Sequence, residues 1–319
     1  MRKAAALLAV FGLTALFVEC GRKERNPASV GQAIPHETLR PLTAFKGEIV
    51  FQSDLDGDNE IYLLTAEGVR KLTDNAWQDE FPRWSPDGTK IAYWANPGGQ
   101  YEVHLMEADG SGQTALTENA GSDISYAGLG WFPDGKRIAY TVEKDRAFGR
   151  DHTAMAIDIE TRRTGRFLPQ SREKLTTPHF SPADPVFGFT GKRLAGWDVA
   201  LYNFETGRAS FVTEGGKACR PCFSKDGRKI AFVSSAADGK GDIWLADRDG
   251  SGQVRLTVRD ETYDYFPSWS PDGKWIVFCS STDHYPTEGR WSLLLVSVET
   301  GAVEPLFESS RRDLFPDWR

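Results

Sequence analysis

Four cysteines and five histidines are the side chains in this 319-residue sequence best suited to bind metals or act as nucleophiles. Cys219 and Cys222 form a C-x-x-C pair, which can be a redox centre or half of a zinc site. A zinc site needs about four ligands, and the sequence has no second such pair. We therefore interpret the pair as two residues of one strand that point to opposite faces. A disulfide between two of Cys219, Cys222 and Cys279 stays open.

The histidines are scattered along the chain, and the sequence has no H-x-H motif. His104 and His179 occupy predicted strand positions beside aromatic or apolar residues, so we expect packed core side chains. His152 and His284 fall in predicted loops, where a solvated side chain is a simpler interpretation than a ligand. The sequence therefore predicts no metal site and no cofactor.

Two other signatures of function are incomplete. Residues 54–60 read Asp-Leu-Asp-Gly-Asp-Asn-Glu, which resembles a calcium loop, but Gly57 is fourth where an EF-hand needs glycine at the sixth position. We expect this segment to join two strands. A serine hydrolase would need a G-x-S-x-G elbow, and the sequence contains none. These patterns favour a protein that is not an enzyme.

One phrase recurs along the chain, and such a repeat is the strongest indicator of fold. It reads Phe-Pro-Arg-Trp-Ser-Pro-Asp-Gly at 81–88 and Phe-Pro-Ser-Trp-Ser-Pro-Asp-Gly at 266–273. Ser-Pro-Asp-Gly is a tight turn, because proline presets φ, aspartate bonds the local backbone and glycine accepts positive φ. Weaker or truncated copies complete a series of aromatic anchors at positions 84, 131, 180, 223, 269 and 318.

Each full copy is followed by an apolar run, a strand with an acidic start, a glycine turn and a strand that ends in Leu-Thr. Four short strands in each repeat of 43 to 49 residues are typical of a propeller blade. The predicted fold is all-β, a six-bladed β-propeller of four-stranded antiparallel blades. Three strands precede residue 81 and one, at 314–318, follows the last full repeat. The C-terminal strand should therefore pair with the N-terminal strands and close the ring, which removes open sheet edges.

The W-S-P-D-G-x-K-I-A-[YF] phrase, the [DE]-[IV]-x-L strand and the A-D-G turn resemble the repeat of TolB-like, WD-type (PD40) β-propellers of the bacterial envelope. The resemblance covers about residues 45–319 and is weakest around Phe180 and Phe223. It implies a periplasmic platform that binds other envelope proteins. Propellers carry many unrelated activities, so the resemblance specifies the fold more closely than the function.

The N-terminus is predicted to be an export signal over residues 1–20. Two basic residues precede a 15-residue apolar run, which is shorter than the roughly 20 residues of a membrane span. Cys20 follows, as in bacterial lipoprotein signals, although Glu19 departs from the small residue favoured there. Lipidation of Cys20, ordinary cleavage and a retained anchor all stay open. Residues 21–44 are polar and predict a flexible linker, and residues 45–319 form the predicted propeller.

The charge balance narrows the classes of partner. The chain has 38 Lys and Arg against 45 Asp and Glu, a net charge of -7. This balance argues against binding to nucleic acid and against adhesion to anionic lipid surfaces. We expect an exported, periplasmic monomer whose contact with a membrane is through a lipidated Cys20.

The candidate binding residues follow from the geometry of a propeller. Two kinds of connection lie at the same end of a propeller: those that enter each innermost strand and those between the second and third strands of a blade. We call this end the loop face. The Ser-Pro-Asp-Gly turns lie at the opposite end, the turn face.

Three aspartates stand two residues before the phenylalanine of a repeat, where they either cap their strands or form an acidic surface for a basic or polar partner. The predicted binding residues are Trp77, Asp79, Tyr126, Tyr263, Asp264 and Asp313. The wider loop-face set adds Arg146, Arg150, His152, His284, Tyr285, Arg311 and Arg312.

These features favour a non-catalytic scaffold of the cell envelope that binds proteins through its loop face. The alternative is an envelope enzyme or carbohydrate-binding propeller that works at the axial channel. Convergent histidine and carboxylate side chains in the channel would favour the alternative. A flat acidic face would favour the scaffold.

Overall fold

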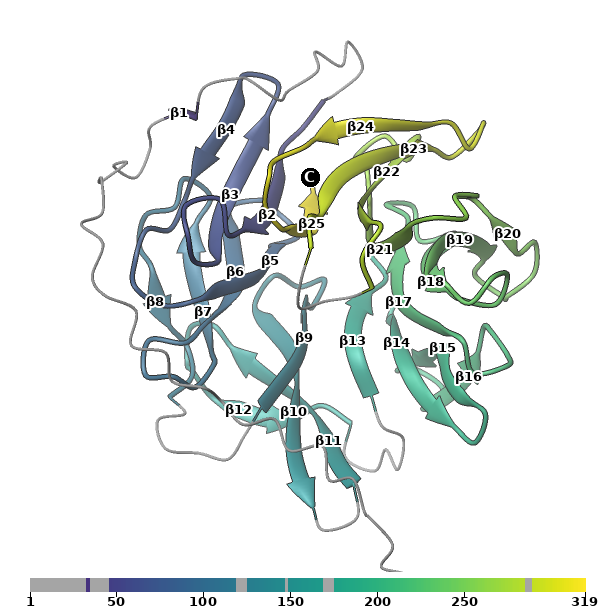
Figure 1. The fold of residues 1–319 in the computed structure, drawn as a ribbon. Helices are drawn as coiled ribbons and strands as arrows, with labels where there is room; N and C mark the ends of the chain where they lie inside the picture. The colour runs from purple at the N-terminus through teal and green to yellow at the C-terminus, as the bar shows by residue number, and fades with distance from the viewer. Residues whose placement is uncertain (1–32, 35–45, 119–124, 147–148, 169–174, 285–288) are drawn as a thin grey trace, which may run out of the picture.

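A computed structural model describes residues 33–34, 46–118, 125–146, 149–168, 175–284 and 289–319. The regular secondary structure in these ranges consists of β-strands, and none of these residues belongs to a helix that could cross a membrane. Figure 1 shows six sheets around a central axis, with β5, β9, β13, β17, β21 and β25 innermost. Neighbouring strands within each sheet are antiparallel, so the predicted six-bladed propeller is confirmed.

The blades are numbered around the ring, and each is given from its innermost strand outward. Blade 1 contains β25 (Asp313–Trp318), β2 (Ile49–Ser53), β3 (Glu60–Thr65), β4 (Gly68–Lys71) and β1 (Ala33–Ile34). Blade 2 contains β5 (Asp79–Trp84), β6 (Lys90–Ala95), β7 (Glu102–Glu107) and β8 (Thr114–Ala115). Blade 3 contains β9 (Ser125–Trp131), β10 (Arg137–Arg146), β11 (Gly149–Asp158) and β12 (Thr164–Arg166). Blade 4 contains β13 (Leu175–Phe180), β14 (Val186–Arg193), β15 (Gly196–Asn203) and β16 (Arg208–Phe211). Blade 5 contains β17 (Ala218–Phe223), β18 (Lys229–Ser234), β19 (Asp242–Asp247) and β20 (Val254–Arg255). Blade 6 contains β21 (Tyr263–Trp269), β22 (Trp275–Ser281), β23 (Ser292–Ser297) and β24 (Val303–Phe307).

The ring closes in blade 1, as the sequence predicts. The C-terminal strand β25 pairs antiparallel with β2, with Ile49 opposite Trp318 and Ser53 opposite Asp313. The backbones of Glu48 and Arg319 exchange two hydrogen bonds of 3.0 Å beyond this pairing. Within the predicted linker, β1 pairs antiparallel with β4 at the outer edge of the same blade.

The hydrophobic core lies between the blades rather than at the axis. The described residues form six apolar clusters, and each cluster joins two neighbouring blades. The interface of blades 1 and 6, for example, buries Phe51, Val277 and Trp318. Each sheet is therefore apolar on both faces, which explains the apolar runs in the second and third strands of each repeat.

The anchor tryptophans also hydrogen-bond neighbouring blades. Trp131 Nε1 donates to the Arg83 carbonyl at 3.1 Å, and Trp269 Nε1 donates to the Cys222 carbonyl at 3.0 Å. In blades 3 and 6 the anchor tryptophan thus fills the core and satisfies a backbone group of the preceding innermost strand, whereas Trp318 Nε1 donates to the Lys46 carbonyl at 2.9 Å.

The Ser-Pro-Asp-Gly segments form tight turns at the turn face. In blade 2, Asp87 Oδ1 accepts hydrogen bonds from Ser85 Oγ at 2.6 Å and from the Thr89 amide at 3.0 Å. Gly88 has a φ of 69°, in the left-handed region where glycine is favoured. The turn sequence therefore has a structural role in reversing the chain.

Each innermost strand contains a β-bulge where the repeat reads Phe-Pro. The pairing register shifts at this point in all six blades. The residue at the Phe position, which we call position one, has a positive φ between 52° and 67°. Proline follows it in five of the six blades, and because proline has no N–H it can occupy a bulge without losing a ladder hydrogen bond. The position-one residues are Phe81, Gly128, Thr177, Arg220, Phe266 and Phe315.

Candidate functional site

The bulges aim two rings of side chains into the central channel. Position one forms the ring nearer the loop face. The residue just before each anchor aromatic, which we call position three, forms the second ring. The position-three residues are Arg83, Gly130, His179, Cys222, Ser268 and Asp317. Phe266, Phe315 and Cys222 also contribute to the apolar clusters between blades, whereas the other members of the two rings differ in chemistry from blade to blade.

The loop-face mouth of the channel is a cavity of about 320 Å³ with largely aromatic walls. Its lining residues are Glu80, Phe81, Trp94, Tyr101, Gly128, Thr176, Thr177, Arg220, Phe266 and Phe315. The Phe315 ring packs 4.1 Å from that of Phe266 and 4.5 Å from that of Phe81, measured between centroids. The Arg220 guanidinium lies 4.5 Å above the Phe266 ring. Aromatic residues and arginine are the types enriched in protein-binding hot spots.

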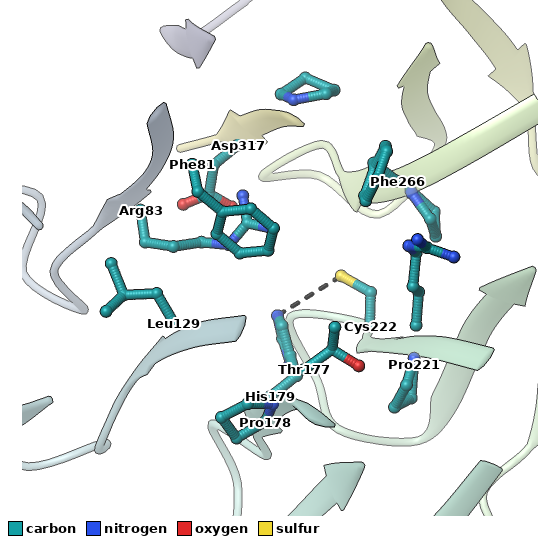
Figure 2. A pocket seen from close by; sticks show the side chains of 13 residues that line it. Phe81, Arg83, Leu129, Thr177, Pro178, His179, Pro221, Cys222, Phe266 and Asp317 are labelled. Carbon is teal, nitrogen blue, oxygen red and sulfur yellow. Dashed lines mark hydrogen bonds between the residues drawn. The ribbon is translucent and has the colours of Figure 1, made fainter. Parts of the chain in front are cut away.

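Below this mouth the channel narrows to a waist with a cavity of about 30 Å³. Figure 2 shows His179 and Cys222 pointing toward each other across the waist, with Nε2 and Sγ 3.4 Å apart. The backbone amide of Phe223 donates to His179 Nδ1 at 3.3 Å. Since Nδ1 accepts a hydrogen bond, the neutral ring carries its proton on Nε2, which faces the sulfur.

The electrostatics of this pair do not suit a nucleophile. Burial, together with the charges of Arg83 and Lys225, lowers the pKa of His179 to about 3. Burial, followed by the charge of Asp317, raises the pKa of Cys222 to about 12. The sulfur is therefore a thiol and the imidazole is neutral at pH 7, with no lone pair of the ring aimed at the thiol proton. An activated cysteine needs the opposite arrangement, with a depressed thiol pKa and a base beside it.

On the turn-face side of the waist the channel widens to a cavity of about 370 Å³, which we call the turn-face cavity. Arg83, His179, Cys222 and Asp317 line both the waist and this cavity. Asp317 accepts hydrogen bonds from the Trp84 amide at 2.7 Å and from Ser268 Oγ at 3.2 Å. The position-three ring thus places a cation and an anion at the narrowest part of the channel.

The three predicted loop-face aspartates are fully buried, with 0% exposure of Asp79, Asp264 and Asp313. Asp313 Oδ1 accepts a hydrogen bond from Ser53 Oγ at 2.7 Å, and its Oδ2 accepts one from the Ser309 amide at 3.3 Å. Asp264 and Asp79 are bonded in the same way, to Ser280 Oγ at 2.6 Å and to Asn75 Nδ2 at 2.6 Å. Each of these carboxyls thus accepts a hydrogen bond from a neighbouring polar side chain.

Burial is the main influence on the ionisation of these carboxyls. It raises the pKa of Asp79 to about 6 and that of Asp313 to about 7, against the lowering effect of their hydrogen bonds. It also raises the pKa of Asp264, although the nearby Arg259 opposes the change. A buried carboxyl that is protonated for part of the neutral range is a weak source of negative potential at a surface.

The remaining predicted binding residues lie around the loop-face mouth. Trp77 is half-buried against the core between blades 1 and 2. Tyr263 is half-buried at the start of β21, with the His284 ring 5.1 Å away and Lys240 Nζ 5.7 Å above its own ring. Tyr126 lies in β9 (Ser125–Trp131), but its side chain is outside the described part of the chain.

Residues of the wider set have similarly varied positions. His284 and Arg311 are exposed, whereas Arg312 donates from Nε to Asp54 Oδ2 at 2.9 Å. Arg146 and Arg150 lie in β10 and β11, and their side chains are outside the described part of the chain. Tyr285 and Cys20 lie wholly outside the described residues, as does the predicted export signal.

Two expectations about histidines were wrong. His179 was expected in the core, but the bulge of β13 turns it into the channel waist. His152 was expected in a loop, but it lies within β11 opposite Glu143, with Nδ1 3.1 Å from Glu143 Oε1. His104 is buried beside Tyr93, as expected.

The described residues include three of the four cysteines. Cys219, Cys222 and Cys279 are free thiols, and Cys219 and Cys222 flank the bulge of β17. No three histidine, cysteine, aspartate or glutamate side chains of the described residues are grouped so that they could hold a metal ion.

Sequence reasoning missed the position-three ring. Its signal was present, because each member directly precedes an anchor aromatic at 84, 131, 180, 223, 269 or 318. Aligning the six repeats on that aromatic places an arginine, a histidine, a cysteine and an aspartate at the same height in the channel. The bulge that turns them inward was not predicted, so this column of residues was not selected.

Known proteins with similar sequences include propellers of different roles. Residues 150–307 match the family model of the TolB beta propeller domain. An uncharacterized protein of Agrobacterium fabrum is 29% identical over 78% of this chain and 83% of its own length. The Tol-Pal system protein TolB of Francisella tularensis is 28% identical over 77% of this chain, and dipeptidyl-peptidase 5 of Porphyromonas gingivalis is 24% identical over 76% of it. The match spans 53% of that TolB and 42% of that peptidase.

Solved structures support the same fold. TolB from Acinetobacter baumannii superposes with a TM-score of 0.70 at 22% identity, over 86% of this chain and 67% of that one. The superposition, the six closed blades and the family match agree with the repeat phrases of the sequence. This chain is a six-bladed β-propeller whose repeats are similar to those of the TolB beta propeller domain.

Proposed function

We propose that this propeller is an exported, non-catalytic protein of the cell envelope that binds a protein partner at its loop face. The observation that carries the proposal is the loop-face mouth, a cavity of about 320 Å³ with aromatic walls and one arginine. A rigid ring holds this mouth open, and the partner would insert a loop or chain end into it. The relationship to a Tol-Pal system protein supports an envelope partner and a periplasmic location.

The structure refines the chemistry proposed for the partner. The buried aspartates Asp79, Asp264 and Asp313 would support the walls, while Trp77, Tyr126 and Tyr263 would contact the partner at the rim. The cation of Arg220 lies inside the mouth, stacked over Phe266 and 5.2 Å from the Tyr265 ring centroid. Glu80 also lines the mouth, but its Oε1 already accepts a hydrogen bond from Asn59 Nδ2 at 2.7 Å. An inserted apolar segment with an acidic group that reaches Arg220 would therefore fit this lining better than the basic partner that an acidic face would attract.

The waist supports the non-catalytic part of the proposal. His179 and Cys222 are the pair most similar to a base and a nucleophile in the described channel, and their pKa values favour the unreactive neutral forms. Dipeptidyl-peptidase relatives share the propeller segment over less than half of their length. Their peptidase activity therefore gives no direct expectation for this chain.

Site-specific photo-crosslinking in intact cells tests the proposal. A benzophenone amino acid replaces Tyr101, which lines the loop-face mouth, and in a separate variant replaces Pro86, which lines the turn-face cavity. We expect a defined crosslinked partner from position 101 and none from position 86. Arg220→Glu in the first variant should reduce that crosslink, because it reverses the charge in the mouth. Crosslinks from position 86 alone, or from neither position, would contradict the proposal.

A further inference from the structure

The turn-face cavity is a second site with a different lining from the loop-face mouth. Its volume of about 370 Å³ is enough for a small organic molecule, and it opens beside the exposed Pro86 and Pro182. The waist of about 30 Å³ separates it from the loop-face mouth. A ligand there would be independent of any partner at the opposite face.

Cationic side chains outnumber carboxylates in the lining of this cavity. Arg83, Lys225 and Arg319 line it, against Asp317. Arg319 is already engaged, since it pairs with Glu48 and stacks 3.8 Å from the centre of the Trp84 ring. Arg83 and Lys225, which donate to backbone carbonyls and have no carboxylate partner in hydrogen-bond contact among the described residues, are therefore the two cations that we consider first for a ligand.

Arg83 is the better placed of these two cations. Its Nη1 donates to the Pro82 carbonyl at 3.0 Å, and among the described residues its guanidinium makes no ion pair within 4.0 Å. The guanidinium carbon lies 4.4 Å from the centre of the Phe81 ring, and Arg83 lines both the waist and the cavity. A guanidinium has five N–H donors, so one hydrogen bond leaves donors for a ligand. Burial lowers the pKa of Arg83, and the charge of Asp317 only partly opposes this. An anion in the cavity would compensate a cation that has lost most of its water.

Lys225 provides a second contact near the opening of the cavity. Its Nζ donates one hydrogen bond, to the Trp318 carbonyl at 2.9 Å, and an ammonium has three donors. The lining also includes the edges of the largely buried rings of Trp131, Phe180 and Trp269 and the exposed prolines Pro86 and Pro182. A flat apolar body could lie against these rings while its charged group reaches a cation.

From this arrangement we propose that the turn-face cavity binds a small organic anion, a flat apolar molecule that carries one carboxylate, sulfonate or phosphate group. Arg83 holds the anionic group at the waist, and Lys225 contributes the second positive charge. Asp317 limits the site to a single anionic group, because it would repel another. The inference concerns a different face from the proposed protein partner and does not depend on it.

Fluorescence titration of the purified protein tests this inference with 1-anilinonaphthalene-8-sulfonate as the anionic probe. N-phenyl-1-naphthylamine has the same rings without the sulfonate and is the matched neutral probe. We expect Arg83→Gln to weaken binding of the sulfonate at least about tenfold, the loss typical of one charge-assisted hydrogen bond, and to leave the neutral probe unaffected. Lys225→Gln should have a smaller effect in the same direction.

Two further variants separate recognition of charge from loss of folding. Asp317→Asn keeps an oxygen that can accept from the Trp84 amide but removes the negative charge, so it should tighten binding of the sulfonate. Arg220→Gln removes an arginine from the loop-face mouth and should leave the affinity unchanged. The inference is overturned if the wild type binds neither probe, if Arg83→Gln leaves sulfonate binding unchanged, or if Arg220→Gln alone weakens it. Thermal melting of each variant confirms that it is folded.

Discussion

Replacement of Asp313 by asparagine should change how the stability of the propeller depends on pH. Asp313 is fully buried in the closing strand, and burial raises its pKa from 3.8 to about 7. The folded state therefore binds this proton more tightly than the unfolded state does. The contribution of this carboxyl to stability is fully present below pH 4 and is lost as the pH rises from about 4 to about 7, because folding then opposes ionisation.

The size of the effect follows from the two pKa values. Each pH unit within this window costs about 1.4 kcal/mol, so the wild type loses about 2–3 kcal/mol between pH 5 and pH 8 through this carboxyl. Asparagine has the same shape and no charge, so it does not suffer this loss. It also presents either its amide nitrogen or its oxygen to the Ser309 amide, and a mismatch there costs roughly 1–3 kcal/mol at every pH.

The stability of the variant relative to the wild type should therefore shift in the variant's favour by about 2–3 kcal/mol between pH 5 and pH 8. Urea unfolding, followed by tryptophan fluorescence at several pH values, measures this difference. Asp272→Asn is the matched control, since Asp272 lies in an exposed turn with a lowered pKa, and its stability difference should be flat from pH 5 to pH 8. A flat difference for Asp313→Asn, or one that shifts toward the wild type, would refute the assignment of a protonated buried carboxyl.

Three other outcomes are expected. Deletion of residues 314–319 should abolish cooperative unfolding and cause aggregation, because losing Phe315 and Trp318 alone costs roughly 6–10 kcal/mol of a typical 5–15; a melting curve like that of the full chain would contradict closure. Thr177→Gly should raise the melting temperature or leave it nearly unchanged, because threonine at a φ of 52° is strained by roughly 1–2 kcal/mol. A large decrease in melting temperature would show that the 2.9 Å contact between the Thr177 and Thr190 hydroxyls outweighs this strain. Cys20→Ser should release the protein from membranes in a detergent partition assay if Cys20 is lipidated, and unchanged partitioning would show another mode of attachment or none.

The blade architecture could be predicted from the sequence because its determinants are local and repeated. The Ser-Pro-Asp-Gly turn specifies a chain reversal within four residues, and Asp87 and Gly88 do so in the structure by the contacts that their types suggest. The strand count before the first repeat and after the last one also predicted closure by β25. That argument needs no contact energies, because the single C-terminal strand adds the fourth strand to the three strands at the N-terminus and so completes a blade.

The bulges could not be predicted in the same way, since their conformation opposes local preference. A phenylalanine rarely adopts the left-handed region, yet Phe81, Phe266 and Phe315 all do so. This conformation coincides with the shift of register against the neighbouring strand. A Phe-Pro pair read alone indicates an extended segment, because the residue before a proline avoids the helical region. Tertiary context outweighed that preference in each blade.

The burial of the loop-face carboxylates also could not be predicted from the sequence. Asp313 precedes the aromatic repeat by two residues, a spacing that fits either a solvated loop or a strand cap. The environment of Asp313 is decided by its partner Ser53, which is distant in sequence and adjacent only after the ring has closed.

The Leu-Thr ending has a similar role, because Thr73 Oγ1 donates to Glu60 Oε2 at 2.6 Å and accepts from the Ile61 amide at 2.9 Å. The acidic strand start and the distant threonine are thus two parts of one buried contact.

A comparison of the six repeats within the chain separates structural positions from positions that are free to serve function. The anchor position is tryptophan or phenylalanine in every blade, because it fills the core between blades. The position before it is a different residue in each blade: arginine, glycine, histidine, cysteine, serine and aspartate. Both positions lie on the same strand, one residue apart, so backbone geometry does not explain the contrast. Side chains at this position contribute less to the core than the anchor aromatics do, although Cys222 packs in it, and their diversity is what a site with several distinct contacts requires. The channel, rather than the outer surface of the blades, is therefore where a ligand of this propeller should be sought.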